Sequence, residues 1–269
     1  MKKEMVQSEK RKEVVKQLLS FVTEKRRDFP WRKKQTGYRV LVSELMLQQT
    51  QVGRVVEKYE DFLKCYPNLL ALRETTLSEL LLAWKGLGYM RRIKSLKAIA
   101  MQVAQVPKKR EDLLVLPGIG DYTGGAIMAF AYNEFFPILE TNIKTVLCFH
   151  FCHKKESTRC LALDTYKVLV SALYVDSALS PRLFYEAMMD YGSELKKRKV
   201  VVCKAVRKQK PFKGSSRELR AKLLYQITNK EKLDTSDPRS NEVLLMLVSE
   251  GFIFKTLRGY ERRCHARAH

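Results

Sequence analysis

The stretch LPGIGDYTGGAI, from Leu116 to Ile127, decides the fold of this chain. Pro117, Gly118 and Gly120 permit a tight turn whose backbone N–H groups face outward. A helix is predicted from Thr123 onward, and the partial positive charge at its N-terminus also favours an anion. Such a hairpin between two helices can bind one phosphate group. A plain helix–turn–helix corner with structural glycines is the alternative explanation of the same residues.

Helical periodicity extends on both sides of this hairpin. Near the N-terminus, Val14, Leu18, Phe21 and Val22 share one face of an amphipathic helix. Between residues 38 and 191 apolar side chains recur with a period near 3.6, in the segments VLVSELMLQQ, LSELLLAWKGL, IKSLKAIAMQVA, YTGGAIMAFAY, NIKTVLCFHF, TYKVLVSALYV and RLFYEAMMDYG. The breaks between these segments fall at prolines and glycines, where helices start or turns form. The sequence therefore predicts an all-α fold.

The C-terminal part of the chain is predicted to form a separate small unit. From Lys196 to Gly214 the chain is basic and lacks helical periodicity, which indicates a linker or a surface loop. SSRELRAKLLYQI and RSNEVLLMLVSEG then predict two amphipathic helices, and FIFKTLRGYERR alternates around Gly259 as a short hairpin does. Helices followed by a hairpin are typical of a winged-helix module. We therefore expect one domain over residues 1–213 and a second over residues 214–269.

The charge of the chain points to a polyanionic partner. The formal net charge is +22 and the isoelectric point is near 9.8, and most of the surplus falls in residues 1–35 and 196–232. Nucleic acid is the leading candidate, and an anionic membrane surface is the competing one. No apolar run approaches the roughly 20 residues of a spanning helix, and the N-terminus lacks the apolar core of a signal peptide. We expect a soluble intracellular protein, in the cytoplasm or nucleoid if the source is bacterial.

The six cysteines are few and irregularly spaced for a disulfide scaffold, so reduced thiols are expected. One local group has ligand types that suit zinc, and it consists of Cys148, His150, Cys152, His153 and Cys160. Its spacing matches no paired zinc-ligand pattern, and Cys148 falls inside a helical run. We therefore favour a helix end followed by a basic loop and expect no metal site.

Four segments together resemble a known family. They are SELMLQQTQV (43–52), WKGLGYMRR (84–92), LPGIGDYTGGAI (116–127) and FPILETNIKTVL (136–147). In order and separation they are similar to the motifs of adenine DNA glycosylases of the helix-hairpin-helix superfamily, over about residues 29–192. This resemblance implies a two-lobed helical fold and a role in base excision repair. It also implies a monomeric protein that binds double-stranded DNA at a mismatched or damaged base.

Cleavage of an N-glycosidic bond passes through a cationic sugar, so a site needs an acid for the leaving base and an anion for the sugar. Glu44 matches the family's catalytic acid, which requires a raised pKa, and its neighbours Leu45, Met46 and Leu47 favour one by desolvation. A surface glutamate on a helix is the alternative. Glu140 stands where the family has an aspartate that stabilises or attacks the sugar.

The change from aspartate to glutamate keeps the charge at position 140 but adds one methylene, and activity is then retained, slowed or redirected. A helix-capping or purely structural role is the alternative for Glu140. Asn142 matches a family residue that orients this region, and an ordinary helix cap is its alternative.

The resemblance assigns further residues around the flipped base. Relatives with lyase activity carry a Schiff-base lysine at the position of Tyr122, so a tyrosine there implies hydrolysis alone and an abasic product. A buried core tyrosine is the alternative. Trp31 and Arg32 match residues of the base pocket, and Gln49 and Tyr89 match the wedge that fills the gap left by the flipped base. Ordinary helix and loop positions are the alternatives for this wedge pair.

The chain departs from the family in two further places. Most members hold a 4Fe-4S cluster with four cysteines, but Lys196 stands at the first of these positions and Cys203 is the one cysteine in that segment. The sequence therefore predicts no cluster, and the run Lys196 to Lys199 either contacts phosphate or forms a solvated surface. The family's usual C-terminal domain for 8-oxoguanine is replaced by the short module after Gly214.

These observations favour a monofunctional glycosylase for adenine mispaired with guanine or 8-oxoguanine. Two alternatives remain open. The same fold accommodates a thymine or uracil glycosylase, and the Glu140 change is compatible with a DNA-binding protein that has lost catalysis.

Overall fold

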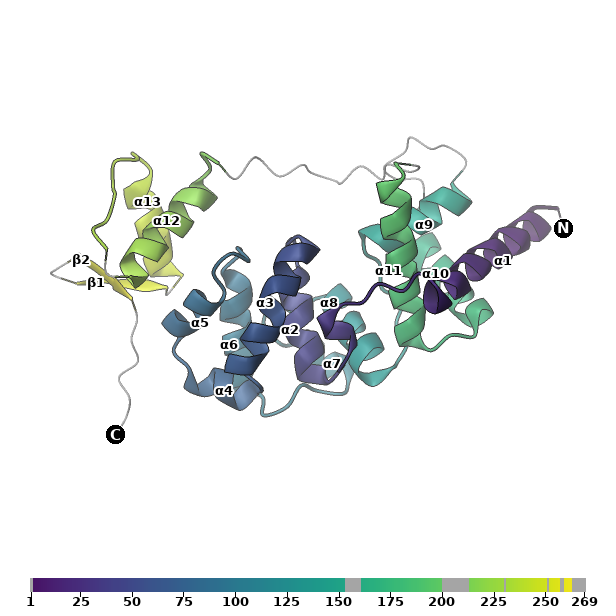
Figure 1. Cartoon of the computed structure of the whole chain (residues 1–269), viewed down its shortest axis with the longest axis horizontal. Helices are drawn as coiled ribbons and strands as arrows, with labels where there is room; N and C mark the ends of the chain where they lie inside the picture. The colour runs from purple at the N-terminus through teal and green to yellow at the C-terminus, as the bar shows by residue number, and fades with distance from the viewer. Residues whose placement is uncertain are drawn as a thin grey trace. The chain divides into compact units, whose positions relative to one another are not determined.

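The computed structural model describes residues 2–152, 161–199, 213–229, 231–250, 252–256 and 259–262 (Figure 1). The chain divides into two compact units, each built from two segments. Unit 1 consists of Met1–Glu44 and Gln105–Arg207, and unit 2 consists of Leu45–Ala104 and Lys208–His269. Apart from one short hairpin, every regular element of the described residues is a helix, which confirms the predicted fold class. None of the described helices is both long and apolar enough to cross a membrane.

Unit 1 is a group of helices packed around α11 (Pro181–Lys197). The N-terminal helix α1 (Lys2–Thr23) lies against α11 through the face that the sequence predicts, since Val14, Leu18 and Phe21 are buried (Figure 1). The remaining elements of this unit are η1 (Pro30–Arg32), most of α2 (Gly37–Leu47), α7 (Arg110–Leu114), α8 (Asp121–Ile127), η2 (Met128–Tyr132), α9 (Thr141–Phe151) and α10 (Leu163–Ser177).

In unit 1, α9 and α11 pack extensively against each other and lie side by side (Figure 1). Ser180 caps α11 by accepting a hydrogen bond from the Leu183 N–H, and Pro181 occupies its first turn. A side chain at Gly192 would overlap the backbone of Asn142, so glycine permits this close approach. The expectation of a linker from Lys196 onward is wrong at its start, because α11 continues through Lys197.

The first segment of unit 2 holds α3 (Val52–Cys65), α4 (Leu69–Glu74), α5 (Leu77–Ala83) and α6 (Arg91–Gln102). The short helices start at side-chain caps. Asn68 accepts a hydrogen bond from Ala71 N at the start of α4, and Thr76 and Glu79 form a reciprocal capping box on α5. Such caps satisfy backbone donors that a helix of one or two turns cannot pair internally.

The C-terminal part contains α12 (Ser216–Thr228), α13 (Ser240–Ser249) and a hairpin of β1 (Ile253–Thr256) and β2 (Gly259–Arg262). The strands are antiparallel, with Ile253 opposite Arg262, so the predicted order of two helices and a hairpin is confirmed. Its core is formed by the buried residues Leu219, Leu223, Leu224, Ile227, Val243, Leu244, Leu247, Phe252 and Ile253.

This core is not closed on itself. Leu77, Leu81 and Met90 from the first segment of unit 2 pack against it, and Lys94 on α6 donates to the backbone carbonyl of Glu250. The compact units therefore cut across the division after residue 213, and that domain division stays a prediction.

Candidate active site

Glu44 lies in α2 on a buried stretch of helix. Its residue is 6% exposed, and Val42, Ser43, Leu45 and Met46 around it are also buried. The pKa of the Glu44 carboxyl is raised to about 7. Burial is the largest cause, a hydrogen bond with Tyr122 opposes it, and the negative charge of Glu140 adds to it. A carboxyl with this pKa is partly protonated at neutral pH and can donate a proton there.

Tyr122 stands in the first turn of α8, and its side chain is hydrogen-bonded to Glu44. Burial, followed by the charges of Glu44 and Glu140, raises the pKa of the Tyr122 hydroxyl well above its usual value. The hydroxyl therefore stays protonated and donates to the carboxylate form of Glu44. Tyr122 thus has a polar partner in the structure, and its place beside the flipped base stays a prediction.

The hairpin before α8 sets where that helix starts, and so where it places Tyr122. Gly118 has a φ of 83°, in the left-handed region that favours glycine, and Gly120 is the N-cap of α8. Gly118 and Gly120 are exposed and Pro117 is half-buried, so the turn faces solvent within its unit. Gly125 approaches Ile138 so closely that a side chain would overlap it, which brings α8 against the segment that ends at Glu140.

Glu140 is the N-cap of α9, and its carboxylate is held by three N–H groups. Oε1 accepts from the backbone N–H of Asn142 at 2.6 Å and from that of Ile143 at 3.0 Å, and Oε2 accepts from Asn142 Nδ2 at 3.2 Å. The capping interpretation is thus realised in the structure. It does not compete with a chemical role, because the same charge acts on the pKa of Glu44.

Asn142 links Glu140 to α11. Its Nδ2 donates to Glu140, and its Oδ1 accepts from Lys196 Nζ at 2.7 Å. Lys196 is half-buried and belongs to the last turns of α11, so it is neither in a linker nor on a fully solvated surface. The unit thus brings Glu44, Tyr122, Glu140 and Asn142 together, and Lys196 is an additional member that the sequence had placed elsewhere.

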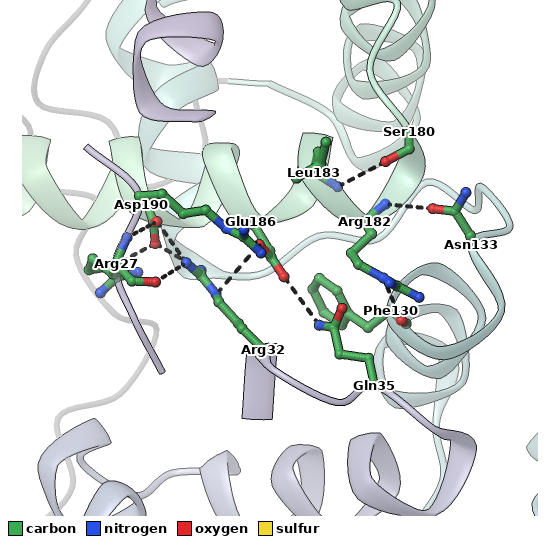
Figure 2. Close-up of polar contacts among 11 residues, drawn as sticks. Arg27, Arg32, Gln35, Phe130, Asn133, Ser180, Arg182, Leu183, Glu186 and Asp190 are labelled. Carbon is green, nitrogen blue, oxygen red and sulfur yellow. Dashed lines mark hydrogen bonds and ion pairs between the residues drawn. The ribbon is translucent and has the colours of Figure 1, made fainter. Parts of the chain in front are cut away.

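Arg32 is engaged in buried ion pairs, as Figure 2 shows. Its Nη1 and Nη2 donate to the two carboxylate oxygens of Asp190 at 2.8 and 2.9 Å, and its side chain is 8% exposed. Arg27 donates to Asp190 as well, and Gln35 and Arg26 donate to Glu186.

Asp190 is buried, which alone would raise its pKa, but the hydrogen bonds and charges of Arg32 and Arg27 hold the pKa of this carboxyl below its usual value. The guanidinium of Arg32 therefore anchors the segment after α1 to α11. Its neighbour Trp31 is 9% exposed and stacks on Phe29 with ring centroids 4.7 Å apart.

The two residues matched to the wedge lie in unit 2, where both have unusual backbone conformations. Gln49 has a φ of 55° and Tyr89 a φ of 46°. Left-handed backbone at non-glycine residues is costly by about 1–3 kcal/mol, and it persists where surrounding contacts enforce it. Gln49 is exposed and Tyr89 is half-buried.

Arg92 supplies those enforcing contacts, and the sequence reasoning missed it. Its guanidinium donates to the carbonyls of Leu45 and Met46 at 2.7 and 2.6 Å, before the Gln49 turn. The same group donates to the carbonyls of Leu87 and Gly88 at 2.8 and 3.0 Å, before Tyr89, and to Thr50 Oγ1 at 2.9 Å. Burial lowers the pKa of Arg92 to about 10, so it keeps its charge. Its place in WKGLGYMRR, one turn after a glycine-rich loop, was the available signal.

The cysteine and histidine group does not assemble in the described part of the chain, which contains no cluster of three or more metal-ligating residues. Cys148 Sγ lies 3.1 Å from the hydroxyl of Tyr166, and His150 Nε2 lies 2.8 Å from that of Tyr191. His153 and Cys160 fall outside the described residues. Cys152 is disulfide-bonded, so the expectation of reduced thiols throughout is wrong at that position.

Residues 42–168 match the family described as HhH-GPD superfamily base excision DNA repair protein. The chain is 40% identical over 127 residues to the adenine DNA glycosylase of Buchnera aphidicola subsp. Schizaphis graminum, covering 45% of this chain and 37% of that protein. It is 30% identical over 245 residues to the adenine DNA glycosylase of Buchnera aphidicola subsp. Baizongia pistaciae, covering 85% and 64%. The chain thus spans less than two thirds of either relative.

A solved structure supports the same fold. The chain is similar to a thermostable thymine-DNA glycosylase, with a TM-score of 0.58 and 28% sequence identity over 78% of this chain and 95% of that chain. The helical fold implied by the four motifs is thereby confirmed.

Proposed function

We propose that this chain is a monofunctional DNA N-glycosylase of the HhH-GPD superfamily of base excision DNA repair proteins, the family whose model matches residues 42–168. Its substrate is an adenine mispaired with guanine or 8-oxoguanine. The observation that carries the proposal is the buried Glu44. Its pKa is raised to about 7, and the negative charge of Glu140 contributes to that rise. An acid and an anion with different environments are the pair that glycosidic cleavage requires.

Each member of the site has a role in this reaction. Glu44 in its protonated form donates to the leaving adenine, which removes the negative charge that would build up on the base. Glu140, held by the first turn of α9, stabilises the cationic sugar at its other side. Tyr122 holds Glu44 by a hydrogen bond and offers no amine for a Schiff base, so water completes the reaction and an abasic site is the product.

The remaining predicted residues are assigned to DNA. The exposed turn of Pro117, Gly118 and Gly120 binds a phosphate of the duplex, which its exposure and the net charge of +22 favour. Gln49 and Tyr89 fill the gap in the base stack, supported by the buried Arg92. We propose that the protein acts as a monomer that binds one mismatched site.

Trp31 and Arg32 both belong to the base pocket in this proposal, but Arg32 does not contact the base. Arg32 is bound to Asp190, so it shapes the base pocket through its ion pairs and does not offer a free guanidinium to the base. Trp31 keeps its assignment to the pocket wall.

We also propose that the chain carries no iron–sulfur cluster. The residues do not fit one, because Lys196 replaces the first cysteine and its ammonium is bound to Asn142 Oδ1. An iron assay and visible absorption of the purified protein test this, and stoichiometric iron would overturn it.

The deciding experiment is single-turnover base release from duplexes that hold A opposite 8-oxoguanine, A opposite G, T opposite G, or U opposite G. Wild type, Glu44→Gln and Glu140→Gln are compared, with Glu57→Gln at an exposed position as the matched control. We expect excision of A by wild type and the control alone. Tight binding without an abasic product from any duplex would refute the enzyme and favour a DNA-binding relative.

A second substrate has one specific observation in its favour. The similar solved structure is a thymine-DNA glycosylase that this chain covers almost completely. Release of T or U with no release of A would assign the chain to that substrate class while keeping the roles of Glu44 and Glu140.

A further inference from the structure

We propose that Lys196 is a positioning residue of this site. Its ammonium on α11 fixes the side-chain amide of Asn142, and through that amide it fixes the Glu140 carboxylate at the N-terminus of α9. The inference rests on the proposed function, because it assigns a role to the carboxylate that the reaction uses. Lys196 stands where most members of the resembled family have the first cysteine ligand of the 4Fe-4S cluster.

The first step concerns the orientation of the Asn142 amide. An ammonium has three donors and no acceptor, so only the amide oxygen can face Lys196. The 2.7 Å contact from Nζ to Oδ1 therefore turns Nδ2 toward Glu140, where it donates to Oε2 at 3.2 Å. With the amide reversed, an oxygen would face the carboxylate and an N–H group would face the ammonium. Both contacts would be repulsive.

The second step concerns the freedom of Glu140. A glutamate has one more rotatable bond than the aspartate of the resembled family, so more contacts are needed to hold its carboxylate in one place. Two backbone N–H groups hold Oε1, and the Asn142 amide is the further donor that holds Oε2. Loss of that amide leaves Oε2 free to turn about Oε1.

The third step concerns the framework. Gly192 and Lys196 are four residues apart on α11, so they lie on the same helix face. At Gly192 the helix meets the backbone of Asn142, and at Lys196 it meets the side chain of the same residue. One face of α11 thus seats both the main chain and the amide of the residue that orients Glu140.

The test uses the full chain and three variants. Lys196→Met keeps the length of the side chain but removes the charge and donors, Lys196→Arg keeps both, and Lys197→Met removes a neighbouring exposed charge from the same helix. We expect Lys196→Met to lower the single-turnover rate at saturating DNA by about ten- to a hundredfold, as displacement of a catalytic group does. Affinity for the duplex should change by less than about threefold. Lys196→Arg should retain most of the rate and Lys197→Met all of it.

A double-mutant cycle then distinguishes positioning from a general structural effect. If Lys196 acts through Asn142, Lys196→Met should cost no further rate when Asn142 is already alanine. Multiplying rate losses in the double variant would overturn the inference, as would a loss of DNA affinity at an unchanged rate, which would make Lys196 a phosphate contact.

A readout independent of activity keeps the two proposals apart. Hydrogen exchange at the backbone N–H groups of Asn142 and Ile143 reports the Glu140 cap directly. We expect faster exchange there in Lys196→Met and unchanged exchange in Lys197→Met. If wild type releases no base but this difference is present, the proposed function fails while the Lys196 contact stands. Equal exchange in all variants overturns the contact.

Discussion

Replacement of Glu44 by glutamine should make the protein more stable, by an amount that grows with pH. The folded state holds a proton on Glu44 up to a pKa of about 7, whereas the unfolded chain releases it near the ordinary 4.5. Wild type therefore loses stability as pH rises through that window, and above about 7 the loss is complete. Glutamine has a similar shape and does not titrate, so it avoids this penalty.

The size of the effect follows from the shift. A rise from 4.5 to about 7 corresponds to about 3 kcal/mol of unfolding free energy at pH 8, and to about 1 kcal/mol at pH 5. Urea denaturation of wild type, Glu44→Gln and Glu57→Gln at pH 5, 6, 7 and 8 measures the difference directly. A stability gain that is the same at all four pH values would refute the burial of a titrating carboxyl. The control should show no pH-dependent difference at its exposed site.

Three further outcomes are expected. Tyr122→Phe removes the hydrogen bond that lowers the pKa of the proposed acid, so the alkaline limb of the single-turnover rate should move to higher pH; an unmoved or acid-shifted limb contradicts this assignment. Arg92→Met leaves several buried carbonyls without a donor and should lower the unfolding free energy by about 3 kcal/mol or more, whereas Arg91→Met on the exposed face should change it by less than about 1 kcal/mol in urea denaturation. Gly192→Ala should destabilise unit 1 by about 1–3 kcal/mol because its side chain meets a backbone, and Gly53→Ala, with open space around it, should be neutral or slightly stabilising in the same assay.

Helical periodicity was enough to predict most of the fold. The faces of α1, α12 and α13 follow from apolar spacing, and the hairpin of β1 and β2 follows from alternation around Gly259. Periodicity did not predict the contacts of side chains that combine a long apolar stem with a charged end. Lys196 reads as one cation in a basic run, yet its stem and ammonium reach the start of another helix.

The site shows the same division. The positions of Glu44, Tyr122 and Glu140 could be anticipated from linked motifs, because residue types and spacing persist in sequence. The buried contacts of Arg92 and Arg32 could not, since arginine is ordinarily exposed and its burial depends on acceptors brought in from distant segments. For Arg92 these acceptors are carbonyls about five and 45 residues away, and no local pattern identifies them.

The order of segments in unit 1 determines when the site can assemble during synthesis of the chain. Glu44 is the last residue of the first segment, and Tyr122 and Glu140 belong to the second, beyond an excursion of roughly sixty residues that forms the first segment of the other unit. While the ribosome has made only the first segment, Glu44 is an ordinary solvated carboxyl with no reason to hold a proton at neutral pH. Its acidity changes only when the returning chain buries it, so proton affinity at this residue is a reporter of assembly. A nascent fragment that ends before Glu140 contains Glu44, but it lacks the charge of Glu140 that helps to raise the pKa of Glu44.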